Sequence, residues 1–118
     1  VRSNTPLQAL TMANDPAFLE LAQGFAERLL RELPSADIAA RIERAYQLAL
    51  CRAPSETERK LLVDYFEAQA SDFASDATAA SKLATDAMKA GPEPYTRGAA
   101  LVCVARAILN TDNFITRE

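Results

Sequence analysis

Alanine content is the feature of this sequence that most restricts its fold. The chain has 24 Ala among its 118 residues, but only four Val and four Ile. Ala is the strongest helix former, whereas β-branched residues favour strands. Apolar residues make up 49% of the chain, and a chain of this length can bury a sizeable core. The sequence therefore predicts an all-α fold, a compact bundle of about five to six helices.

The length of the chain favours a single helical domain over residues 1–118. Its first residue is Val1, so we expect it to be a fragment of a larger chain. The net charge of −3 and the pI near 5.0 give no electrostatic reason to bind nucleic acid. No apolar run approaches the roughly 20 residues that cross a bilayer, so we expect no membrane span. The oligomeric state stays open.

Helix start signals divide the chain clearly. Asp15 precedes Pro16, a cap followed by proline at the first helical position. Ser55 and Glu58 have the spacing of a capping box, and residues 5–8 resemble one. Gly91 is a plausible end signal for the fifth segment. The predicted helices span residues 6–13, 16–33, 35 or 37 to 51, 56–73, 74–90 and 96–110.

Apolar spacing predicts which helix faces are buried. The last helix, about residues 96–110, is apolar nearly all round, which is typical of a helix at the centre of a bundle. Arg106 is its single charged interior residue, and we expect residues 111–116 to form a short tail that packs Phe114 on the core. In the third helix, Arg41 lies mostly off the apolar stripe. The predicted core face of helix 56–73 has Leu61 beside it and consists of Leu62, Tyr65, Phe66, Gln69 and Phe73.

The sequence contains little that could catalyse a reaction. Without His there is no His general base, no Ser-His-Asp triad and no His-ligated metal. The chain also lacks a glycine-rich phosphate loop and a haem-attachment motif, so we expect no cofactor in this segment. Cys51 and Cys103 both lie among apolar helical residues, which predicts buried free thiols. A single disulfide stays open if the compartment is oxidising.

Polar residues gather near both ends of the chain and form the one candidate site. If the termini meet, carboxamide and carboxylate groups could bind a sugar or a hard cation, with Arg106 paired to Asp15, Asp112 or a carboxylate of a missing domain. The competing interpretation is that these residues are helix caps and turn formers. The candidate cluster consists of Asn4, Asn14, Asp15, Arg106, Asn110, Asp112 and Asn113.

The chain resembles a known family at both ends and in the middle. The sequence SNTPLQAL at residues 3–10 is its most specific part. A middle segment, residues 45–54, also resembles the family, which usually has Gly where this chain has Cys51. The other matching segments are residues 14–18, 26–28 and 104–114. The family is the planctomycete-type domain of unknown function 1553, and the chain resembles its C-terminal portion.

The resemblance implies a context. Members are typically exported, which implies an extracytoplasmic (periplasmic or secreted) location, and they often carry a cytochrome-c-like domain upstream. Haem would then lie elsewhere in the parent chain, and the upstream domains would be the partners. We expect an uncharacterised helical structural or interaction module, or a docking surface for the cytochrome domain. The alternative is part of a carbohydrate-acting or redox enzyme whose site is shared with the missing upstream segment.

Overall fold

The computed structural model describes residues 15–115, with side chains as far as Thr111. Six helices and no strand occur in this part of the chain, which confirms the all-α prediction. The predicted helix at residues 6–13 lies outside the described residues. The helices are α2 (Pro16–Glu32), α3 (Ile38–Leu50), α4 (Glu56–Ala74), α5 (Ala77–Leu83), α6 (Asp86–Ala90) and α7 (Tyr95–Ile115).

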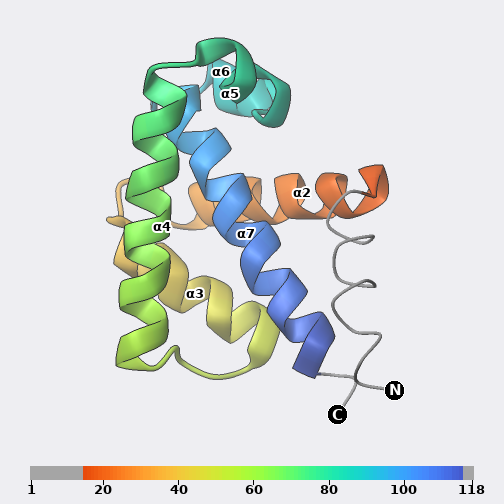
Figure 1. Cartoon of the computed structure of the whole chain (residues 1–118), viewed down its shortest axis with the longest axis vertical. Helices are drawn as coiled ribbons and strands as arrows, with labels where there is room; N and C mark the ends of the chain where they lie inside the picture. Colours follow the sequence, from red (N-terminus) through yellow and green to blue (C-terminus); the bar gives the residue numbers. More distant parts are fainter. Residues whose placement is uncertain (1–14, 116–118) are drawn as a thin grey trace.

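The last helix, α7, lies at the centre of the bundle, as predicted. It contacts each of the other five described helices, and Figure 1 shows it crossing the molecule diagonally between α4 and α2. Its end differs from the prediction, because residues 111–115 continue the helix and do not form a separate tail. The side chain of Phe114 lies outside the described part, so its predicted packing stays a prediction.

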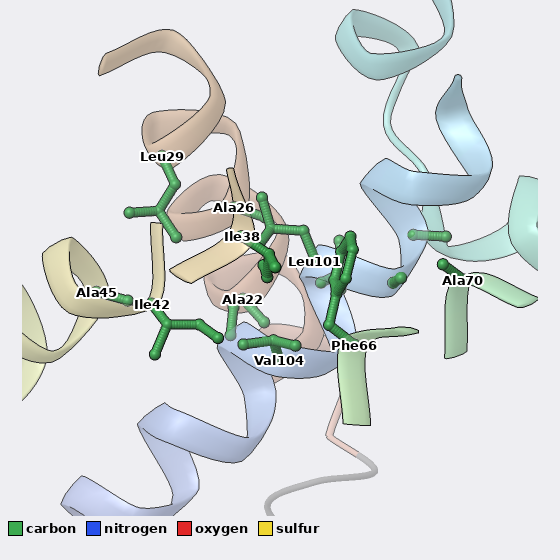
Figure 2. Close-up of a cluster of buried hydrophobic side chains, with 14 of the residues drawn as sticks. Ala22, Ala26, Leu29, Ile38, Ile42, Ala45, Phe66, Ala70, Leu101 and Val104 are labelled. Atoms are coloured by element: carbon green, nitrogen blue, oxygen red, sulfur yellow. The ribbon is translucent and has the colours of Figure 1, made fainter. Parts of the chain in front are cut away.

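Small and branched apolar residues allow α7 to occupy this position. Figure 2 shows Leu101 and Val104 of α7 among side chains of the three longest neighbouring helices, with Ile42 from α3 and Phe66 from α4. Burying such side chains contributes about 1.5–3 kcal/mol each. The α7 residues that are buried and hydrophobic are Ala99, Ala100, Leu101, Val102, Val104, Ala105 and Ile108.

The predicted N-terminal caps are confirmed in α2, α3 and α4. The Asp15 carboxylate accepts a hydrogen bond from the amide of Ala17 at 2.9 Å, and Asp37 does the same for α3. In the capping box, the Ser55 hydroxyl accepts from the Glu58 amide at 3.1 Å, while the Glu58 carboxylate accepts from the Ser55 amide at 2.8 Å. Each cap satisfies backbone donors that a helix leaves unpaired.

The segment predicted as one helix over residues 74–90 is two short helices, and this prediction is wrong. Ala84 ends α5 with an extended backbone, and the Thr85 hydroxyl then caps α6 by accepting from the Met88 amide at 3.2 Å. Gly91 is the C-cap of α6, as predicted. The thin apolar stripe of this segment buries few side chains, among them Ala80 and Met88, so a local cap is sufficient to divide it.

Two further predictions about burial are wrong. Arg41 is 4% exposed, because the end of α2 and the loop before α7 surround its guanidinium. Tyr65 was predicted on the core face of this helix but is exposed, while α4 buries Phe66, Ala70 and Phe73. Leu61, predicted beside the core face, is exposed as well.

Cys51 is exposed as well and Cys103 is half-buried, both as free thiols, so the predicted burial of Cys51 is wrong. Cys51 ends α3 in the left-handed conformation, with φ of 58° and ψ of 31°. This conformation suits Gly, and it places the side chain outside the helix.

Candidate functional site

The structure accounts for Asp15 as a helix cap. Its carboxylate accepts a hydrogen bond from the Ala17 amide at the start of α2. This is the capping role that was the alternative to ligand binding. Asn4 and Asn14 lie outside the described residues. Of the N-terminal members of the candidate cluster, the described part therefore contains the carboxylate of Asp15, which caps a helix.

The C-terminal members of the predicted cluster lie on the last turns of α7. The side chains of Asp112 and Asn113 lie outside the described part, although their backbone is helical. Asn110 is half-buried, and its Oδ1 is buried without a hydrogen-bond donor among the described residues. A buried acceptor without a donor costs about 1–3 kcal/mol, so Asn110 is the member of the predicted cluster that calls for an explanation.

Arg106 faces α4. It forms no ion pair with a described residue, Asp15 included. Burial raises the pKa of Tyr65 of α4 and of Cys103 of α7, and the positive charge of Arg106 partly opposes this rise in both groups. The structure therefore places Arg106 beside the contact between α4 and α7.

A polar seam joins α4 and α7 at this point. The Cys103 thiol donates to the Gln69 carboxamide oxygen at 3.8 Å. Burial raises the pKa of the Cys103 thiol and of the Tyr65 hydroxyl, and outweighs the effect of Arg106. The thiol is therefore protonated at neutral pH, and a protonated thiol is a poor nucleophile. The seam provides packing and polar contacts, and its thiol is not activated for covalent chemistry.

The outer side of this seam is partly apolar and open to solvent. Leu61 is 64% exposed and Tyr65 is 39% exposed, and the two residues lie four positions apart on one face of α4. Together with Arg106 they form what we call the α4–α7 face (Leu61, Tyr65 and Arg106). Large apolar side chains exposed in a group are typical of an interaction surface.

A second polar cluster surrounds Arg41 and was not predicted from the sequence. The Arg41 guanidinium donates from Nη2 to Glu93 Oε2 at 2.6 Å and from Nη1 to Glu93 Oε1 at 3.2 Å. The same group donates to the carbonyls of Leu33 and Pro34 at 2.9 and 3.0 Å. One side chain of α3 therefore holds the end of α2 and the loop before α7 together. Arg41 and Glu93 are far apart in sequence, so no local sequence pattern indicates their contact.

A hollow of about 270 Å³ lies next to this cluster. It is bounded by the second half of α2, by α6, by the loop between α6 and α7, and by the start of α7. Most of its wall is apolar, with charged groups at Glu27, Arg31 and Glu93. The other lining residues are Leu30, Pro34, Ala87, Met88, Gly91, Pro92, Pro94 and Gly98.

Two kinds of site are missing from the part of the chain that the structure describes. No group of three or more His, Cys, Asp or Glu side chains lies where it could hold a metal ion between residues 15 and 111. None of the helices α2 to α7 is long and apolar enough to cross a membrane.

The fold and these sites define an all-α domain with buried structural contacts and open surfaces. Comparison with protein families identifies the family of this domain. The chain belongs to the family described as Protein of unknown function (DUF1553), whose model matches residues 1–66. The match includes α2, α3 and the first half of α4. Comparisons with curated proteins and with solved structures give no significant match.

Proposed function

We propose that this chain is a helical interaction module of a larger exported protein and that it packs against the upstream part of that protein through the α4–α7 face. The observation that carries the proposal is the exposure of Leu61 and Tyr65 on adjacent turns of α4. Full burial of a Leu side chain contributes about 1.5–3 kcal/mol. Covering this face would therefore favour association.

The composition of the face indicates what the partner surface must supply. Tyr and Arg are enriched among the residues that dominate binding energy at interfaces, and the face holds Tyr65 and Arg106. Because Arg106 has no ionic partner among the described residues, we expect a carboxylate opposite it. The proposal thus requires a partner surface that combines an apolar patch with an acidic group.

The family context supports the rest of the proposal. The resemblance of both chain ends to the exported, cytochrome-c-linked members favours an extracytoplasmic location. We assign haem to the upstream part, since this chain has no His and no haem-attachment motif. The isolated chain, once purified, should show no haem absorption band, and a stoichiometric haem or metal would contradict this assignment.

Binding between two separately produced parts tests the proposal. Calorimetric titration of the upstream part into this chain should give saturable binding. Leu61→Ser and Tyr65→Ser should each weaken it by about tenfold or more, as expected for interface anchors. The matched control is Leu21→Ser, because Leu21 is 57% exposed on α2, outside the face. No binding, or equal weakening by all three changes, would contradict the proposal.

The Asn110 acceptor, which has no hydrogen-bond donor among the described residues, favours a second candidate, a carbohydrate-acting or redox site shared with the upstream segment. In that case a donor from the substrate or from the upstream part would reach Oδ1. Titration of the parent protein with neutral oligosaccharides should then give binding heat that Asn110→Ala abolishes and the α2 control Gln23→Ala retains. Equal heats in the two variants would reject this candidate.

A further inference from the structure

The hollow beside α6 has fixed walls. The end of α2 and the loop before α7 are two of its sides, and Arg41 bonds to both through the Pro34 carbonyl and the Glu93 carboxylate. Arg41 itself is buried. Walls held by a buried, multiply bonded side chain keep their shape without a ligand, so little ordering is needed when one binds.

Met88 and Gly98 both line the hollow, and the Met88 side chain packs directly against Gly98. A Cβ atom on Gly98 would lie 2.9 Å from the Met88 sulfur, so the absence of a side chain at position 98 lets the thioether settle close to α7. Methionine sulfur makes favourable contacts with aromatic rings. Pro34, Pro92 and Pro94 in the wall add rigid apolar surface.

The rim supplies a cation. Arg31 lines the hollow and forms no ion pair with a described residue. Arginine over an aromatic ring is a favourable contact, and the contact occurs twice elsewhere among the described residues. Arg52 lies 5.2 Å from the Tyr46 ring centre, and Arg97 lies 4.8 Å from that of Phe66.

The volume sets the size of the ring. An apolar protein cavity of roughly 150 Å³ holds benzene, and this hollow measures about 270 Å³. From the fixed walls, the Met88 thioether in the lining, the Arg31 guanidinium that stands beside the carboxylates of Glu27 and Glu93, and this volume, we infer that the hollow is a binding site for a neutral aromatic molecule of about the size of indole. The inference is independent of the α4–α7 face, since none of the lining residues belongs to that face.

Methyl NMR of Met88 with indole as the probe tests this inference. The sequence has two methionines, Met12 and Met88, so the Met12→Leu variant labelled at the methionine methyl gives a single reporter signal. Indole should move this signal upfield, because the methyl lies against the ring. The shift should saturate with a Kd of about 1 mM, as for a small ligand of this size.

Matched variants locate the site. In the Met12→Leu background, Ala87→Leu places a larger side chain on the lining and should abolish the saturable shift. Ala90→Leu makes the same change on α6 at a position that does not line the hollow, and it should leave the shift unchanged. Circular dichroism and the thermal midpoint of both variants show whether each remains folded.

Two comparisons test the chemistry of the ligand. Arg31→Gln should weaken indole binding about threefold, the loss expected for a partly exposed cation–π contact, while Arg28→Gln should not. Cyclohexylmethanol, an aliphatic ring, should bind at least fivefold more weakly than indole. The inference is overturned if the Met88 shift stays linear and unsaturated up to an indole concentration 10 times the expected Kd (about 10 mM). It is also overturned if the Ala87→Leu variant binds indole as well as its parent does, or if cyclohexylmethanol binds as tightly as indole.

Discussion

Arg41 and Glu93 are joined by two hydrogen bonds, of 2.6 and 3.2 Å, although 52 positions separate them. The guanidinium is almost fully buried, whereas the carboxylate is 31% exposed. Nη2 of Arg41 also donates to the backbone carbonyls of Leu33 and Pro34, and Nε donates to the Leu33 carbonyl. This contact therefore fixes the geometry of α2, α3 and the loop before α7 at one point.

Replacing Arg41 should destabilise the protein strongly. Arg41→Met keeps the length of the side chain but leaves the carbonyls of Leu33 and Pro34 and the Glu93 carboxylate without their donor. We expect a loss of about 2–4 kcal/mol in the free energy of unfolding, measured by urea denaturation. Arg44→Met is the control, because Arg44 is 38% exposed and its loss should cost below about 1 kcal/mol. Equal effects of the two changes would show that the Arg41 contact does not organise the fold.

Cys51→Gly should stabilise the protein. Cys51 has a φ of 58°, a conformation that costs an L-residue about 1–2 kcal/mol and costs Gly little. The greater conformational freedom of Gly in the unfolded chain reduces this gain. We expect a net gain of about 0.5–1 kcal/mol in thermal or chemical denaturation. Cys51→Ala removes the thiol but keeps the Cβ, so it should have almost no effect; an equal gain from Ala would assign the effect to the thiol.

Acid should weaken the start of α4. The Arg52 guanidinium, together with the Ser55 amide, lowers the pKa of Glu58 from 4.5 to about 2. Because the pKa is lower in the folded state, the contribution of Glu58 is complete above about pH 5 and is lost as the pH falls towards 2. Because solvent screens this exposed pair, we expect the loss to lower the free energy of unfolding by at most about 1 kcal/mol. Stability measured between pH 6 and 2.5 should fall less steeply for Glu58→Gln than for the native protein. A Glu58→Gln slope equal to the native one would refute the assignment.

The two thiols should react at very different rates. Cys51 is exposed, whereas Cys103 is half-buried with a raised pKa caused mainly by burial. An aromatic disulfide reagent at pH 8 should label one thiol rapidly in the native protein and both thiols in urea. Cys51→Ala should remove the rapid phase, and Cys103→Ala should retain it. Rapid labelling of both thiols without denaturant would contradict the packing of α7 against α4.

Local signals allowed much of the fold to be predicted. Asp15, Asp37 and the Ser55–Glu58 pair mark helix starts within a few residues of sequence, and the apolar character of α7 indicated its central place. The end of α7 was less predictable, because Asn110, Thr111 and the residues that follow include no Gly or Pro to end a helix. In α4, apolar residues occur on more than one face, so spacing alone did not show that Leu61 and Tyr65 are exposed.

The sites were less predictable for a physical reason. Arg41 is buried because of a carboxylate on a distant loop, and the hollow beside it exists only where four segments of the chain meet. Asp15 shows a second difficulty. An aspartate before a helix can serve either as a cap or as a ligand, and its sequence position does not distinguish the two roles. The arrangement of the backbone was needed to distinguish the two roles.

Amide hydrogen exchange of α4 tests the central claim, that the α4–α7 face is covered by the upstream part of the parent protein. Exchange is compared between this chain alone and the same residues in the full parent protein. The proposal predicts added protection at the turns of α4 around Leu61 and Tyr65, with little change on the outer side of α2 near Leu21. Unchanged exchange at Leu61 and Tyr65 in the parent protein would contradict the account.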